Sequence, residues 1–248
     1  MLTLIVVVAA GSFAVFVAQK QQAVQDQELY QLHQQQELLV IDDLITRPAS
    51  NATLSDLNFT VSSNHQLESK ITRINVNGHV LRDWLTYRLN VTSGAWESRL
   101  VQWNDSFVIE PKEQLFIDVN ASDFFETGLN YPATGLVKLE INTGYQNSFS
   151  RAFMPPTAVL SMKTEALWSG TSFNNYLVLD ASASAAQDES SLVSYEWTVT
   201  NKASGLNQTL GGVMTTVQFP SAGDYWINLT VTDNHGLLAM DSLSYTHA

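Results

Sequence analysis

The first eighteen residues contain no charged and no amide side chain, and this run limits what the chain can fold into more than any other feature. It reads MLTLIVVVAAGSFAVFVA, and the first cation follows at Lys20. A run of this length nearly spans a bilayer as a helix. It is too uniformly apolar for an ordinary surface helix, which keeps a polar side. We therefore expect a helix buried in lipid or against other helices.

A cleavable signal peptide is the competing interpretation of this run. Such a peptide has a basic segment before the apolar stretch and a cleavage site before a new domain, and this sequence has neither pattern. The glutamine-rich segment 19–36 continues the helical composition, and no Gly or Pro occurs between residues 12 and 47. We predict a retained helix to about residue 45, roughly 65 Å long at 1.5 Å per residue, within a hydrophobic assembly or transmembrane segment 1–47.

Beyond Pro48 the hydrophobic pattern changes to the two-residue period of β-strands, and no helical period competes with it. Asn77-Gly78 lies between two apolar runs and predicts a tight hairpin. Turn residues recur about every ten positions, which is typical of a β-sandwich. The predicted strands of this region, 48–154, are 57–61, 71–76, 80–81, 87–91, 106–109, 115–119 and 136–141.

Adjacent prolines, Pro155 and Pro156, predict a boundary before a second β domain, 155–248. Its predicted strands are 176–179, 192–200, 214–219, 225–232 and 238–245. The fold class is therefore α+β: a long N-terminal hydrophobic α-helix followed by two all-β immunoglobulin-like sandwich domains. Trp197 and Trp226 alternate with polar neighbours, so we expect both to point into the second sandwich.

The second β domain resembles a polycystic-kidney-disease-type (PKD) domain. The resemblance rests on Pro155–Ala158, Leu179–Ser184, Val193–Trp197 and the long block Ala222–Gly236, in this order and spacing. It implies an extracellular spacer or adhesion module with an immunoglobulin-like sandwich and no active site. The glycine-aspartate loop that often follows the tryptophan strand in the family is absent here.

Residues 1–45 resemble the mature helix of archaeal type IV pilins and archaellins, in which a bare apolar N-terminus leads into a longer helix that carries a β domain. A short basic leader normally precedes that helix, so Met1 is either a processed end or a true start. The resemblance implies a homopolymeric helical filament whose subunits lie in the membrane before assembly, and a charge placed at Val8 or Phe13 is expected to abolish it. The candidate assembly residues are Leu2, Leu4, Ile5, Val6, Val7, Val8, Phe13, Val15, Phe16 and Val17.

Composition excludes several other functions. The chain has 24 acidic and 12 basic side chains and a formal net charge of −12, so no basic cluster exists to bind nucleic acid. Without cysteine it has no disulfides, thiolate metal sites or cysteine nucleophile. The sequence lacks the common catalytic motifs, and its five histidines lack ligand spacing, so we expect no enzyme, cofactor or metal. Calcium is the alternative for four loop carboxylates, although such groups are usually solvated: Asp180, Asp188, Glu189 and Asp233.

Seven Asn-X-Ser/Thr sequons, more than chance predicts, agree with an extracellular location. These candidate N-glycosylation sites are Asn51, Asn58, Asn90, Asn104, Asn120, Asn207 and Asn228. Ser/Thr-rich strands also generate sequons freely, so this signal is open to both interpretations. The favoured function is a pilin, a structural subunit of a type IV pilus-like filament whose β domains adhere to a surface receptor or glycan. The alternative is a monomeric membrane-anchored binding protein or an archaellum accessory protein.

Overall fold

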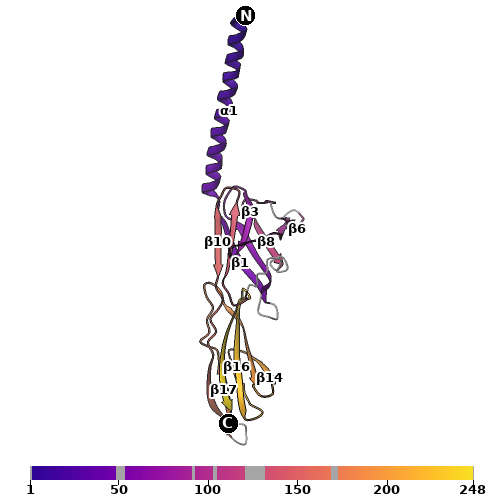
Figure 1. Cartoon of the computed structure of the whole chain (residues 1–248), viewed down its shortest axis with the longest axis vertical. Helices are drawn as coiled ribbons and strands as arrows, with labels where there is room; N and C mark the ends of the chain where they lie inside the picture. The colour runs from indigo at the N-terminus through magenta and orange to yellow at the C-terminus, as the bar shows by residue number, and fades with distance from the viewer. Residues whose placement is uncertain are drawn as a thin grey trace.

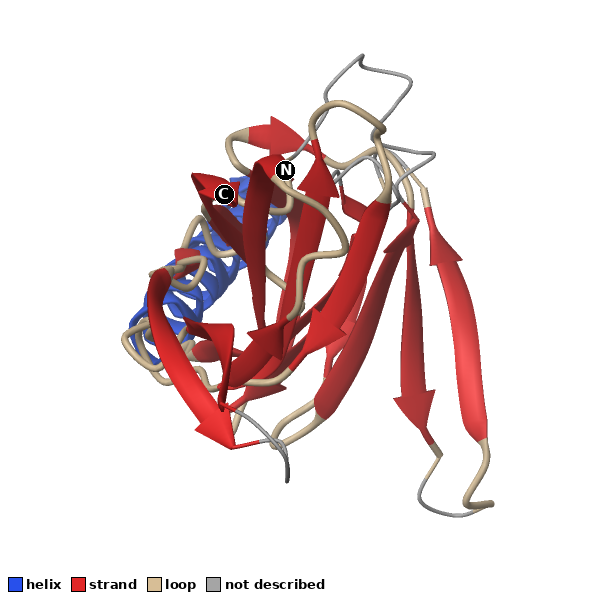
Figure 2. Cartoon of the chain, turned by 90° about the horizontal axis from the view of Figure 1, so that it is seen from below, coloured by secondary structure: helices blue, strands red, loops and turns tan. Residues whose placement is uncertain are grey.

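The computed structural model describes residues 2–48, 54–90, 93–102, 105–120, 132–168 and 173–247. The chain is mostly β-sheet and has one N-terminal helix. Figure 1 shows an elongated molecule in which the helix, a first sandwich and a second sandwich follow one another, so that the two termini lie at opposite ends. Figure 2, the view along this long direction, places the helix behind the strands toward one side of the body.

Helix α1 spans Leu2–Gln36, and its side chains are described from Val15 onward. The prediction that the helix continues to about residue 45 is wrong. Leu39–Pro48 instead forms strand β1, which pairs antiparallel with β2, Leu54–Ser63. The β-branched residues of Val40-Ile41 and Ile45-Thr46 favour a strand. Leu39, Ile41 and Leu44 are buried in the first sandwich, which outweighs the helical tendency of the glutamines before them.

In the described part of the chain no helix is both long and apolar enough to cross a bilayer. The side chains of residues 2–14 lie outside the described set.

The first sandwich packs two sheets around one core. One sheet has the strand order β1-β2-β8-β5-β6, and the other has β10-β9-β3-β4 with β7 paired to β3. Phe59, Leu57 and Ile74 are among its fully buried side chains. The remaining strands are β3 (Ser69–Val76), β4 (His79–Val80), β5 (Trp84–Leu89), β6 (Trp96–Val101), β7 (Phe107–Ile109), β8 (Gln114–Asn120), β9 (Val137–Thr143) and β10 (Ser148–Phe153).

The predicted hairpin at Asn77-Gly78 is confirmed. Val76 pairs with His79 across the two-residue turn, and both turn residues have positive φ angles, 50° and 83°. This is the left-handed backbone that a two-residue hairpin turn of the primed type requires.

The second sandwich packs a three-stranded sheet, β11-β12-β15, on a four-stranded sheet, β14-β13-β16-β17. Trp197 is fully buried at its centre, as predicted, and its Nε1 donates to Gly212 O at 2.9 Å. The strands are β11 (Ser161–Trp168), β12 (Phe173–Asp180), β13 (Leu192–Asn201), β14 (Asn207–Gly211), β15 (Met214–Val217), β16 (Gly223–Asp233) and β17 (Leu238–His247).

The prediction for Trp226 is wrong, because this side chain lies on the outer face of β16 and is 47% exposed. Tyr225, Ile227 and Leu229 occupy the inner face instead. Successive side chains of a strand point to opposite faces, so these residues exclude Trp226 from the core. Its ring lies under the Lys202 ammonium, with Nζ 4.1 Å from the ring centroid.

Candidate assembly helix and interdomain junction

The described surface of α1 exposes large apolar side chains on several sides. Val15, Phe16 and Leu29 are between 55% and 59% exposed, and Val24 and Leu32 are 54% and 43% exposed. At 100° per residue these five positions are distributed around the helix axis. A helix that is apolar on all sides is normally buried by other helices or by lipid.

The base of the helix is fixed to the first sandwich by the turn between β9 and β10. Thr143 Oγ1 and Asn147 Nδ2 donate to Glu37 Oε2 at 2.6 and 2.8 Å, and Asn147 Nδ2 also donates to Gln34 O at 2.8 Å. The Tyr145 ring packs beside Tyr30, with a centroid distance of 5.5 Å. The hydrogen bonds hold the buried Glu37 carboxylate and set the direction in which α1 leaves the body.

His65 of the first sandwich lies close enough to this base to interact electrostatically with Glu37. Its side chain is buried, and Nε2 lies 2.8 Å from Ser69 Oγ. Burial lowers the pKa of His65, and the nearby Glu37 carboxylate opposes this shift. The neutral imidazole is therefore favoured beneath the helix.

The turn between β16 and β17 joins the two sandwiches. Thr46 of β1 donates from N and Oγ1 to His235 O, at 2.7 and 2.9 Å, and His235 Nδ1 lies 2.8 Å from Leu44 O. Leu237, the residue after Gly236, is fully buried and belongs to the core cluster of the first sandwich. Part of the second sandwich thus completes the core of the first.

Gly236 is required by this close approach. Its φ is +80°, and a Cβ built there would lie 2.2 Å from Thr46 O, which is backbone. The buried Asp233 side chain shapes the turn because Oδ1 accepts the His235 and Leu237 amides, both at 2.9 Å. Burial raises the pKa of this carboxyl group, and the amide hydrogen bonds oppose the rise.

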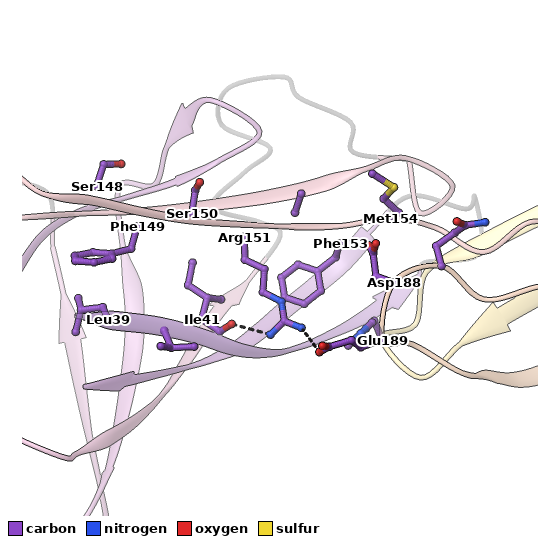
Figure 3. A pocket seen from close by; sticks show the side chains of 14 residues that line it. Leu39, Ile41, Ser148, Phe149, Ser150, Arg151, Phe153, Met154, Asp188 and Glu189 are labelled. Atoms are coloured by element: carbon purple, nitrogen blue, oxygen red, sulfur yellow. Dashed lines mark hydrogen bonds and ion pairs between the residues drawn. The ribbon is translucent and has the colours of Figure 1, made fainter. Parts of the chain in front are cut away.

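A groove of about 810 Å³ runs beside the junction between β1, β10 and residues 187–189. In Figure 3 the Arg151 side chain crosses it. Its Nη1 donates to Ile41 O at 2.9 Å and also to Asp42 O, and Nη2 lies 3.4 Å from Glu189 Oε2. One guanidinium therefore links both sheets of the first sandwich to the second.

The structure describes the side chains of only three residues of the predicted assembly set. Val15 and Phe16 are exposed, and Val17 is half-buried. The side chains of the other candidates lie outside the described residues: Leu2, Leu4, Ile5, Val6, Val7, Val8 and Phe13. Val15, Phe16 and Val17 thus present apolar side chains without a partner from the β body.

The sequons occupy different settings. Asn207 and Asn228 are exposed on the second sandwich, whereas Asn58 is half-buried on β2 and Asn90 donates to Glu97 at 2.7 Å. Asn51 and Asn104 lie outside the described residues, as does the side chain of Asn120.

Three of the four loop carboxylates considered for calcium, all except Asp188, have separate roles. Asp180 accepts the Ser182 amide, Glu189 faces Arg151, and Asp233 caps its own turn. Among the described residues, no three His, Asp or Glu side chains form a group that could hold a metal ion.

Sequence reasoning did not anticipate the junction. It identified residues 233–236 only as a turn, although the apolar pair Leu237-Leu238 directly after it was a signal that the turn meets a hydrophobic surface.

Comparison with known families identifies the second sandwich. A family model described as K319L-like, PKD domain, matches residues 171–246. The second sandwich is a PKD-like domain. Its seven strands in sheets of three and four agree with an immunoglobulin-like arrangement. No curated protein matches the chain.

Three solved structures give partial likenesses. Red sea bream transglutaminase is 7% identical, with a TM-score of 0.28 over 84% of this chain and 31% of its own. The β-glucuronidase of Ruminococcus gnavus is 10% identical, with a TM-score of 0.27 over 86% and 46%. The 47-kilodalton lipoprotein Tp47 of Treponema pallidum is 12% identical, with a TM-score of 0.24 over 84% and 51%. The chain thus spans about a third to a half of these proteins.

Proposed function

We propose that the chain is a structural subunit of an extracellular type IV pilus-like filament of the archaeal kind. In this proposal the N-terminal helix polymerises with copies of itself, and the PKD-like domain projects outward for adhesion. Residues 2–18 lie in the membrane before assembly. The observation that carries the proposal is a helix that leads away from the β body (Figure 1) with apolar side chains exposed around its axis.

Burial of these side chains supplies the driving force for assembly. Each of the five half-exposed residues of the described surface would gain about 1 kcal/mol on complete burial, half of the value for a fully exposed side chain. Their sum, about 5 kcal/mol per subunit, is offset in part by association costs. Residues 2–14 add to it if their uncharged side chains are buried as well. Identical subunits joined head-to-tail by a rotation that does not close form a helical filament.

The arrangement of the chain also supports a filament. The helix is fixed at its base by Glu37 and Asn147, and the two sandwiches are joined by the residue 233–237 turn, so each subunit would add as one body. Few charges occur on the helix, which limits repulsion between parallel copies.

Electron microscopy of material sheared from the cell surface tests this function. Filaments that contain the chain are expected, and Phe16→Glu should abolish them because a carboxylate would be buried between helices. Val193→Glu is the matched control, because Val193 is 61% exposed on the second sandwich, far from the helix. Normal filaments with Phe16→Glu, or a chain extracted only as monomers by detergent, would contradict the proposal and favour the monomeric anchored protein.

A further inference from the structure

The outer face of the first sandwich carries an aromatic cluster that the filament proposal does not use. We call it the ring platform: Tyr87 of β5, Trp96 of β6 and Phe116 of β8. Together with Asp118 these side chains line a hollow of about 270 Å³. We infer that the ring platform is a binding site for a neutral saccharide.

The sheet geometry places the rings on one open face. Leu115, Ile117 and Val119 of β8 are completely buried, so Phe116 and Asp118 between them point away from the core. Tyr87 pairs with Phe116 across β5 and β8, and their rings meet edge to face at 5.8 Å. Trp96 pairs with Leu89 on the neighbouring β6. Three adjacent strands, in the order β8-β5-β6, thus contribute one ring each, and Figure 1 labels the outer two, β8 and β6.

Trp96 is 62% exposed, more than any other aromatic residue whose side chain the structure describes. Water contact with an indole of this size costs free energy unless a ligand covers it. Leu89, which lies opposite it on β5, is 44% exposed, and Leu100, further along the same face of β6, is 51% exposed. Exposed apolar groups gathered in this way mark interaction sites.

The polar groups at the hollow select the class of ligand. Asp118 forms one wall, and the side-chain nitrogen of Asn58, in the orientation that satisfies the amide, donates to Asp118 Oδ1. Burial, followed by the nearby Asp56 charge, raises the pKa of Asp118. The Arg47 charge opposes this rise, but the two carboxyl groups outnumber this one cation, which disfavours anionic ligands such as phosphates or acidic polysaccharides.

A sugar ring has the complementary chemistry. Its C–H face carries partial positive charge and stacks on the negative face of an aromatic ring, while its edge hydroxyls donate to a carboxylate. A protein partner with a flat surface would instead cover Asp118 and remove its water without replacing those hydrogen bonds. Burying a carboxyl group in this way costs free energy. The hollow is slightly smaller than the roughly 300–1,000 Å³ of pockets for drug-sized ligands, which suits one or two sugar rings of a longer chain.

Titration calorimetry of the full-length chain with neutral hexasaccharides tests this site. The probes are maltohexaose, cellohexaose, chitohexaose and mannohexaose, and the detergent has a polyoxyethylene headgroup so that it offers no sugar of its own. At least one probe should bind, and Trp96→Leu should weaken its binding about tenfold or more, because the stacked ring is lost while an apolar group is kept. Trp226→Leu is the control, an exposed tryptophan on the second sandwich that should leave the affinity unchanged.

Sedimentation of the same variants separates a sugar from a second copy of the chain. The inference is overturned if none of the probes binds below about 1 mM, or if Trp96→Leu binds as the parent does. It is also overturned if Trp96→Leu abolishes self-association of the chain and leaves its affinity for every sugar probe unchanged. Circular dichroism and an unchanged unfolding midpoint show that each variant is folded.

Discussion

Gly236→Ala is the sharpest test of how the two sandwiches are joined. The new Cβ would meet Thr46 O at 2.2 Å and Thr46 Oγ1 at 2.9 Å, so the turn must withdraw from β1. Left-handed backbone costs alanine about 1–2 kcal/mol. Withdrawal also breaks the three contacts that link His235 to Thr46 and Leu44, each worth about 1 kcal/mol. The expected total is about 4–5 kcal/mol.

Gly78→Ala is a matched control for this substitution. Gly78 has nearly the same φ, +83° against +80°, but a Cβ there meets no atom within 4 Å. It should therefore cost only the backbone strain, about 1–2 kcal/mol. The two variants differ in the close approach alone, which isolates about 3 kcal/mol for the junction.

Urea denaturation followed by tryptophan fluorescence measures both free energies of unfolding, and small-angle scattering measures how far the sandwiches separate. For Gly236→Ala we expect two resolved unfolding transitions and a broader distribution of interatomic distances. If Gly236→Ala unfolds like Gly78→Ala and keeps the parent scattering profile, the turn does not hold the sandwiches together.

Three further predictions concern the core, the junction and pH. Trp197→Ala should destabilise the second sandwich by about 3–5 kcal/mol, whereas Trp226→Ala should cost under about 1 kcal/mol. The reason is that, of these two side chains, Trp197 alone is buried, and thermal unfolding of both variants measures the difference. Arg151→Met should increase proteolysis of the linker 154–160 because it removes the hydrogen bonds to Ile41 O and Asp42 O; cleavage at the parent rate would contradict this. Burial raises the pKa of Asp233, so the folded chain binds a proton more tightly there than the unfolded chain. This contribution to stability is present at acid pH and lost as the pH rises through the raised pKa. Between acid and neutral pH the parent should therefore lose stability relative to Asp233→Asn. If urea unfolding shows that the stability of both proteins changes equally with pH, the assignment is refuted.

Local features were the ones that the sequence could predict. The hairpin at Asn77-Gly78 and the strands on either side of residues 233–236 depend on neighbouring residues, and both appear in the structure. Trp226 was misplaced because Tyr225-Trp226-Ile227 is apolar throughout, so that alternation alone did not decide which side chains face inward.

Five strands have no predicted counterpart, β1, β6, β10, β11 and β14, and the reasons are identifiable for the first three. β1 follows a glutamine-rich helix without a Gly or Pro to separate them. β6 is exposed on both faces over most of its length, so it lacks the usual alternation. β10 has the charged Arg151 at an inward-pointing position, where its role depends on carbonyl groups of β1 more than 100 residues away.

The ring platform and the junction were beyond sequence reasoning for the same physical reason. The Leu44–His235 contact joins residues 191 positions apart, and the platform combines strands in an order unlike that of the chain. Only the register of the sheets brings Tyr87 beside Phe116.

Because Leu237 is inserted into the hydrophobic interior of its neighbour, the two sandwiches are not interchangeable modules. A chain cut after Phe153 would leave that interior open to water at one end, and a foreign domain attached there would need an equivalent leucine on an equally tight glycine turn. Recombination between related chains should therefore exchange the pair of sandwiches together, with its breakpoint closer to the helix than to the prolines.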